Sequence, residues 1–452
     1  MRPGEMTMDD DKVLVVNEGV DVNGEAASEQ TPGDEPDRQS MSDADIRHNM
    51  KVLILLDSIF FTGAADSALV MTPLYVFLKA SDTQIGLIGS FAWLALIGYF
   101  VSPFISVRFP YKRFYLLVAH IPYIGVYGAL GLALLLSRHL GLSNEWLFGF
   151  LFAMMVANMF FGGFVGLPHQ EYLAACIPMS HRGRFTGFSW SIGAVGGVLA
   201  SAVGYVILRR VDQPMSFGYL LLMSWVIMQT GYLMVLFGRE RPTPVEKAPK
   251  PWTKGMLAAA WKDKLFLRII VLNVICNGLF IPAFFTFVPV YGYRALGMIP
   301  AAAATISIVL QVVRVGASSP IGLLTDRIGP KRVLPIWWAV GCLAFAIVVV
   351  VRHPLAIYIS AALSGLFQIG TTSSFTALIT GVPSPENRSG HFTLLLLAAT
   401  AGASLGMLLL GAMCHLLDYR VTFAILGVVC LAFYPITVRL LAPLSTDAAD
   451  YA

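Results

Sequence analysis

The sequence predicts an all-α polytopic membrane protein in which twelve transmembrane helices form two pseudo-symmetric six-helix bundles. Of the 452 residues, 56% are hydrophobic and only 13% are charged, whereas an average soluble protein carries about 25% charged residues. Apolar stretches recur along the chain, and ~20 apolar residues in a helix cross a ~30 Å hydrocarbon core. Lys and Arg gather in alternate loops between these stretches. These observations exclude a soluble globular fold.

Twelve stretches are long and apolar enough to span a membrane. In chain order they cover residues 52–77, 83–107, 114–137, 145–168, 185–208, 216–237, 265–291, 299–324, 333–351, 354–381, 392–415 and 421–440. The stretch that follows Arg332 is the shortest, so eleven spans is the alternative count.

The loop charges predict the orientation, because Lys and Arg accumulate on the cytoplasmic side of bacterial membrane proteins. With both termini in the cytoplasm, the loops and tail inside hold Arg108, Lys112, Arg113, Arg182, Arg184, Arg327, Lys331, Arg332, Arg388 and Arg439. A dense positive cluster after span six lies on the same side, and the outer loops hold fewer positive residues. We therefore expect a bacterial inner (cytoplasmic) membrane protein, and the net charge of +4 reflects topology, not a nucleic-acid partner.

Three segments lie outside the spans. Residues 1–46 are polar and acidic with almost no aromatic residues, which predicts a disordered cytoplasmic tail. Residues 239–264 combine prolines with positive charges, which predicts a basic cytoplasmic linker. Residues 442–452 form a short cytoplasmic tail. The two bundles therefore cover residues 47–238 and 265–441, here called the first and second halves.

The two halves carry similar sequence features before spans five and eleven. Each loop places a Pro and an Arg ahead of a helix that is rich in small residues, which are Gly193, Gly196, Gly197 and Ser201 in one half and Gly402, Ser404, Gly406 and Gly411 in the other. Small faces let helices approach closely, as moving repeats require. The alternative is tight helix packing without motion.

The segment Gly322–Arg332, between spans eight and nine, reads Gly-Leu-Leu-Thr-Asp-Arg-Ile-Gly-Pro-Lys-Arg. It resembles the G-x-x-x-D-R-x-G-x-[KR]-[KR] loop of the major facilitator superfamily. The spans and the central linker fit the same family, so the resemblance covers about residues 50 to 441. It implies the major facilitator fold, secondary transport by alternating access, and a cavity lined by spans one, four, seven and ten.

By this resemblance the loop forms a charge latch that closes the cytoplasmic side. We expect Asp326 to pair with the start of span five, near Arg182 or Arg184, because an acid near a helix start and an Arg partner are both favourable. The mirror loop has Val107 in place of the Asp, so its latch should be weaker. The alternative is that these charges serve topology alone. The predicted gate residues are Gly322, Asp326, Arg327, Gly329, Arg332, Arg182, Arg184, Arg388 and Glu171.

Two charged residues lie near the middle of predicted spans, Asp66 in span one and Arg314 in span eight. A central Asp or Arg costs ~2.5 to 3.5 kcal/mol on insertion scales, so each should face the bundle interior. The other candidate binding residues are Thr62, Asn158, Asn273, Asn277, Gln311, Gln368, Trp93 and Trp190.

These residues suggest a mechanism in which Arg314 binds an anionic or polar group and Asp66 accepts a proton. The alternative is a permanent structural pair, or two unrelated buried groups. The function predicted is secondary active transport of a small polar or anionic solute, coupled to protons. A non-transporting assembly factor or sensor of the same fold is the runner-up.

Enzymatic functions are disfavoured, because the sequence has no G-x-x-x-x-G-K-[ST] phosphate loop and no H-E-x-x-H zinc motif. The five cysteines show no metal-ligand spacing. We expect no cofactor, no metal and no nucleic acid. The expected partners are a small-molecule substrate, a proton and the lipid bilayer, and the chain should be a monomer.

Overall fold

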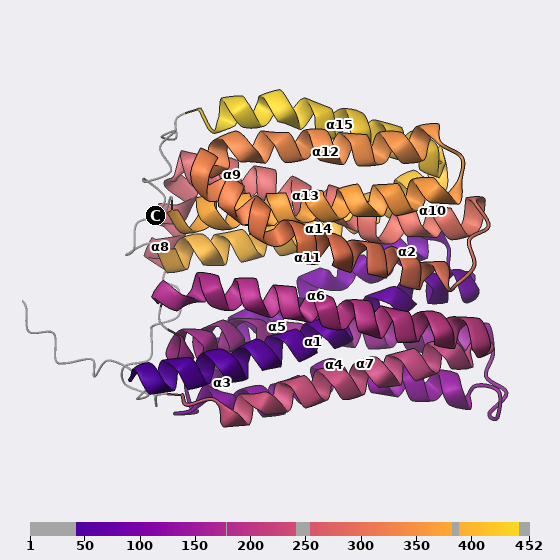
Figure 1. Cartoon of the computed structure of the whole chain (residues 1–452), viewed down its shortest axis with the longest axis horizontal. Helices are drawn as coiled ribbons and strands as arrows, with labels where there is room; N and C mark the ends of the chain where they lie inside the picture. The colour runs from indigo at the N-terminus through magenta and orange to yellow at the C-terminus, as the bar shows by residue number, and fades with distance from the viewer. Residues whose placement is uncertain (1–41, 178, 241–253, 382–387, 443–452) are drawn as a thin grey trace, which may run out of the picture. The chain divides into compact units, whose positions relative to one another are not determined.

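The computed structural model describes residues 42–177, 179–240, 254–381 and 388–442, and within these ranges the side chains of 64–69, 174, 179, 180, 182–184, 186, 254, 256, 257, 380, 381, 388–390 and 392 are not described. The described chain is helical, and its helices run alongside one another (Figure 1). The elements are α1 Asp43–Phe77, α2 Asp82–Ser90, η1 Phe91–Leu94, α3 Ala95–Ser106, α4 Lys112–Leu136, α5 Asn144–Cys176, α6 Met179–Arg210, α7 Met215–Leu233, η2 Met234–Phe237, α8 Lys254–Lys262, α9 Lys264–Ile275, η4 Cys276–Phe280, η5 Ala283–Phe287, α10 Val288–Ala295, α11 Ala302–Ile328, α12 Pro330–Val350, α13 Pro354–Gly381, α14 Arg388–Leu417 and α15 Tyr419–Leu440.

The predicted spans agree with this helix order. In the described part of the chain, eleven helical stretches are long and apolar enough to cross a membrane, from Asp82–Ser106 to Tyr419–Leu440. They correspond to predicted spans two to twelve. Predicted span one falls within α1, which has 35 residues and is therefore longer than the ~20 residues that a crossing needs. The protein is an all-helical integral membrane protein, and the count of twelve stays a prediction.

Local signals in the sequence set the helix boundaries. Ser81 begins α2 with a capping box, in which its hydroxyl accepts from the Gln84 N–H and the Gln84 side chain accepts from the Ser81 N–H. Asp263 caps α9 by accepting from the Phe266 N–H. Gly329 adopts φ +86°, which favours glycine, and so separates α11 from α12. The described part of the predicted linker contains the short helix α8.

The small-residue face of α6 packs against α1 and α11, as the sequence predicts for close helix approach. A methyl group at Gly196 would overlap the Thr62 hydroxyl, and one at Gly197 would lie 3.0 Å from the Gln311 Cδ. The Ser201 hydroxyl donates to the Ser307 hydroxyl at 2.8 Å. This face therefore meets both its own half and the opposite half.

The corresponding face of α14 packs against η4 and α2. A methyl group at Gly406 would overlap the Gly278 backbone, and one at Gly411 would lie 3.0 Å from the Gly86 Cα. The two small faces thus occupy equivalent positions in the two halves. The residues Gly402–Gly406 match G-x-S-x-G, the motif that holds the nucleophilic Ser of α/β-hydrolases. Here the motif lies inside the helix α14, whereas in those enzymes the Ser sits on a strand-to-helix turn.

Candidate functional site

A cavity of about 410 Å³ lies between helices of the two halves. α1 and α6 contribute from the first half, and η5, α10, α11 and α13 contribute from the second. The polar or charged side chains in its lining are Thr72, Tyr293, Ser307, Gln311, Arg314, Ser364 and Gln368. Most of the remaining lining is aromatic or aliphatic. This composition, with few polar groups in an apolar wall, is typical of a small-molecule site.

Arg314 is the only Lys or Arg among the described residues that line this cavity. Its Nη2 donates to the Gln368 Oε1 at 2.7 Å, and its Nη1 lies 3.4 Å from the Gln311 Oε1. The Nε is buried, and no described residue forms a hydrogen bond with it. Because both partners are neutral amides, the guanidinium has no counter-charge among the described residues. The arrangement can bind an anionic group.

The first half contains a second cavity of about 600 Å³, here called the side chamber, whose described lining residues all lie between Leu56 and Tyr232. It contains Asp57, whose Oδ1 lies 3.7 Å from the His169 Nε2. Phe61 and Trp190 line both cavities, and their ring centroids are 5.6 Å apart. These two rings therefore lie between the central cavity and the side chamber.

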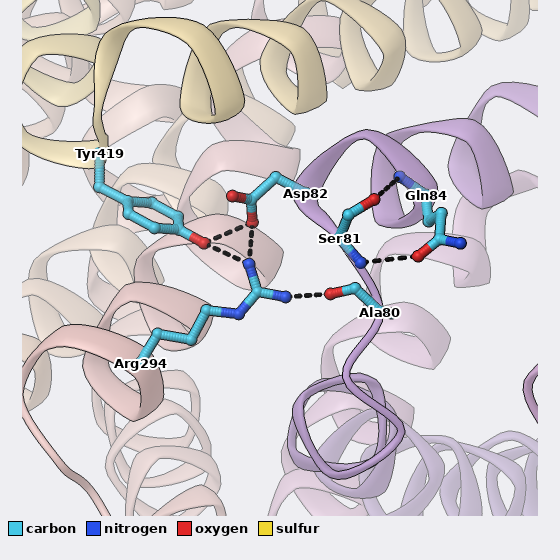
Figure 2. A network of polar contacts seen from close by, with 6 residues as sticks. All are labelled: Ala80, Ser81, Asp82, Gln84, Arg294 and Tyr419. Carbon is cyan, nitrogen blue, oxygen red and sulfur yellow. Dashed lines mark hydrogen bonds and ion pairs between the residues drawn. The ribbon is translucent and has the colours of Figure 1, made fainter. Parts of the chain in front are cut away.

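A polar network joins the two halves near the connection between α1 and α2. This end of the helix bundle is here called the far end, because the described chain termini lie at the opposite end. Figure 2 shows Arg294, at the end of α10, pointing at Asp82 of α2 and Tyr419 of α15. Arg294 Nη1 lies 2.5 Å from the Asp82 Oδ1 and 2.8 Å from the Tyr419 hydroxyl. Arg294 also donates to the Ala80 carbonyl, and the Tyr419 hydroxyl donates to Asp82. This network, here called the far-end latch, holds α2 against the second half.

A family model described as the Major Facilitator Superfamily matches residues 53–316 and 294–449. This chain belongs to the major facilitator superfamily. The resemblance of the Gly322–Arg332 loop to that family is therefore confirmed.

Curated relatives in the superfamily match a shorter stretch. Multidrug resistance protein MdtH of Shigella boydii serotype 4 (strain Sb227) is 30% identical over 166 residues, which is 35% of this chain and 41% of that protein. MdtH of Escherichia coli (strain K12 / DH10B) gives the same identity and coverage. The chain thus matches less than half the length of these relatives.

Solved transporters share the fold over most of the chain. The D-xylose-proton symporter aligns with a TM-score of 0.63 and 15% identity, covering 85% of this chain and 96% of that chain. A POT family transporter in complex with 5-aminolevulinic acid aligns with a TM-score of 0.67 and 11% identity, covering 87% and 96%. At these identities the likeness shows the fold alone.

The superfamily loop lies at the end of the bundle that holds the described termini, here called the terminal end. Asp326 and Arg327 are exposed and form no ion pair with another described residue. Gly322 has no neighbouring atom where a side chain would begin. The side chains of Arg182, Arg184 and Arg388 lie outside the described part, so the predicted latch at this end stays a prediction. Arg332 is also exposed.

The corresponding superfamily loop of the first half, which has Val107 in place of the Asp, lies beside a carboxylate from another segment. Glu240, at the start of the linker, accepts from the N–H groups of Lys112 at 2.6 Å and Arg113 at 3.1 Å, so it caps α4. Burial raises the pKa of Glu240, although these donors and the two positive side chains oppose the rise. Glu171, a predicted gate residue, lies 3.7 Å from the Lys112 Nζ within the same half.

The predicted binding residues are distributed unevenly. Arg314, Gln311, Gln368 and Trp190 line the central cavity, and Asn158 lines the side chamber. The remaining candidates are not among the residues that line either cavity, and these are Thr62, Trp93, Asn273 and Asn277. The side chain of Asp66 lies outside the described part, so its role stays a prediction.

Sequence reasoning missed two groups of residues. Asp82, Arg294 and Tyr419 each lie at a helix end, where polar residues are ordinary, and only their spatial meeting distinguishes them. His120 and Tyr232 stack on each other inside the first half, and nothing in their spacing indicates it. Asp82 follows the helix cap Ser81, where an acidic residue is ordinary, and only the structure shows that its side chain is buried.

Proposed function

We propose that this protein is a secondary active transporter that carries a small polar or anionic solute by alternating access. The observation that carries the proposal is Arg314, a charged guanidinium in a cavity between the two halves whose partners among the described residues are neutral amides. A buried charge without a counter-charge is costly, and a bound anion would supply the missing charge. The neutral oxygens of Gln311 and Gln368 hold the guanidinium in place for that anion.

The arrangement of the two halves supports alternating access. The far-end latch closes the bundle, whereas Asp326 at the terminal end is exposed and unpaired with any other described residue. The small faces of α6 and α14 lie at the seams between the halves, where sliding requires close and smooth contact. We therefore propose a state closed at the far end, with the Asp326 latch forming when the molecule reorients.

Orientation and coupling complete the proposal. We place the terminal end in the cytoplasm of a bacterial inner membrane, following the positive loops, with the chain acting as a monomer. A proton is the proposed coupling ion, and Asp66 in α1 is the proposed carboxylate that accepts it. An Asp66→Asn variant that still drives uphill uptake on a pH gradient would remove this coupling role.

The experiment is a thermal-shift screen of small organic anions on the detergent-purified protein, with benzoate as the first probe. Wild type should show saturable stabilisation. Arg314→Gln should weaken that response about tenfold or more, because a charge-assisted contact is lost. Arg352→Gln, at an exposed position outside the cavity, is the matched control.

Two outcomes would contradict the proposal. One is an anion response that Arg314→Gln leaves unchanged. The other is a co-purifying protein together with no response to any solute, which would instead indicate the assembly role. Uptake of the best ligand into proteoliposomes then tests transport itself.

A further inference from the structure

The side chamber differs from the central cavity because it lies wholly within one half. Its described lining comes from α1, α3, α4, α5, α6 and α7, and no described residue beyond Tyr232 contributes. A molecule bound there would contact one half only and would move with it. Its volume of about 600 Å³ lies within the range of ligand pockets, ~300 to 1,000 Å³.

The charge of the side chamber comes from Asp57. Its side chain is 15% exposed, that of His169 is 17% exposed, and the two are 3.7 Å apart. The other ring nitrogen of His169 lies 3.2 Å from the Tyr232 hydroxyl. No described lining residue is Lys or Arg. Asp57 therefore has a cationic partner only when a proton is bound to His169.

Aromatic rings form much of the chamber wall. Phe60, Tyr99, Tyr123, Tyr232 and Trp190 all line it. The faces of such rings attract cations, more strongly where water is excluded. A carboxylate among aromatic rings is therefore the chemistry that recognises an organic cation.

A second observation also indicates a missing ligand. His120 is fully buried, lines the chamber and stacks on Tyr232. Neither of its ring nitrogens has a hydrogen-bond partner among the described side chains, and a buried polar group is rarely left in that state. A ligand group or a water that enters with it would supply the partner.

We propose that the side chamber binds a lipophilic organic cation, an ammonium group on an aromatic or alkyl body, with Asp57 as its counter-ion and in competition with a proton. One cation enters as one proton leaves the Asp57–His169 pair, so the net charge of the chamber stays the same. The site does not involve Arg314, and it holds whether or not the central cavity carries anions.

The pH dependence follows from the titratable groups that face the chamber. These are Asp57 on α1, Tyr99 on α3, His120 and Tyr123 on α4, His169 on α5 and Tyr232 on α7, while the described lining residues of α6 are not titratable. Tyrosines stay neutral near neutral pH, with an ordinary pKa of about 10. Lys112 and Glu171 pair with each other and do not line the chamber. At acid pH the Asp57–His169 pair therefore binds a proton, which weakens cation binding.

The experiment uses the full chain in detergent and benzyltrimethylammonium, a permanent cation that cannot itself titrate. Its binding is measured by thermal shift and by calorimetry at about pH 8 and about pH 5, either side of the ordinary His pKa. We expect binding about tenfold or more tighter at the higher pH, because a proton then no longer neutralises Asp57. Asp57→Asn should lose this binding and its pH dependence.

Three controls make the result decisive. Benzyl alcohol, which keeps the ring without the charge, should bind more weakly than the cation. Benzoate should respond to Arg314→Gln and not to Asp57→Asn, so failure of anion binding and failure of the side chamber are separate results. Tyr99→Leu, which removes one ring and keeps the carboxylate, should weaken the cation and leave the pH dependence. The ligand-free melting midpoint of each variant checks that it has folded.

The proposal is overturned if Asp57→Asn binds benzyltrimethylammonium as wild type does. It is also overturned if benzyl alcohol binds equally well, because the chamber would then recognise the ring alone. If Asp57→Asn fails to fold, Tyr99→Leu decides the matter, since unchanged cation affinity in that variant excludes the aromatic wall from binding.

Discussion

The two ends of the helix bundle hold their halves together in different ways. At the far end, Asp82 of the first half is buried against Arg294 and Tyr419 of the second. At the terminal end, Asp326 is exposed, and the carboxylate of Glu240, at the start of the linker, binds Lys112 and Arg113 of the first half. Each end thus has an acidic residue near a helix start, but among the described contacts only the far-end acid binds across the two halves.

This difference teaches that the acidic residue marked by a family motif need not be the one that forms the contact. Asp326 lies in the motif, whereas Asp82 was unremarkable in the sequence. The contribution of an ion pair to stability depends on its burial. Removing one partner of a buried pair costs ~3–5 kcal/mol, whereas an exposed pair contributes ~0–1 kcal/mol. If the molecule alternates, the two ends should exchange these roles, and the variants below test that idea.

The largest effect is expected from Asp82→Ala, which leaves the Arg294 guanidinium partly buried without its carboxylate. We expect a loss of ~3–5 kcal/mol from the closed far end. Opening of that end can be measured in a cysteine-free background with Thr72→Cys, which lines the central cavity. A membrane-impermeant maleimide applied from the far side should label this cysteine faster in the variant.

Arg352→Gln serves as the control, since it removes an exposed positive charge outside both cavities. Equal labelling rates in wild type and Asp82→Ala would mean that the far-end latch does not govern access.

The next effect concerns the seam between α2 and α14. Gly411→Val places a branched side chain where the Gly86 Cα lies 3.0 Å from the first added carbon. Overpacking of this kind costs ~1–3 kcal/mol, and we expect a lower melting midpoint together with faster labelling at Thr72→Cys. Gly187→Val is a matched control, because nothing lies near its added carbon. A seam that only packs, and does not gate, would show the lower midpoint without faster labelling.

The sequence predicts those features that depend on one segment at a time. The spans follow from apolar length, since the bilayer sets that length, and Arg314 is visible because a charge stands out in an apolar stretch. The far-end latch needs residues 212 and 337 positions apart to meet, and no local pattern encodes such a meeting. The π-helical turns η4 and η5 in the seventh span were equally invisible.

A smaller effect is expected at Glu240, where an Ala and a Gln variant distinguish the contribution of the charge from that of the helix cap. Glu240→Ala should cost ~1–2 kcal/mol, because the N–H groups of Lys112 and Arg113 lose their acceptor. Glu240→Gln keeps an oxygen there and should cost less.

The pH dependence at this site has a definite sign. Burial raises the pKa of Glu240, so the folded protein binds that proton more tightly than the unfolded chain. Its contribution to stability is therefore complete below the ordinary Glu pKa of about 4.3 and is lost as the pH rises above that value through the raised pKa of the folded protein. Melting curves across this range should show wild type losing stability relative to Glu240→Gln, and the opposite slope would contradict the burial argument.

The smallest effect in this state is expected from Asp326→Asn at the terminal end. The side chain is exposed and has no charged partner among the described residues, so the free energy of unfolding should change by less than ~1 kcal/mol and the melting midpoint should hardly move. If Asp326 latches the terminal end after reorientation, the same variant should slow or unbalance exchange between states. Thr72→Cys labelling from the far side should then fall, because the state open at the far end loses its latch. Unchanged labelling together with an unchanged midpoint would mean that Asp326 serves membrane topology alone. Asp82 would then be the acidic residue that governs access.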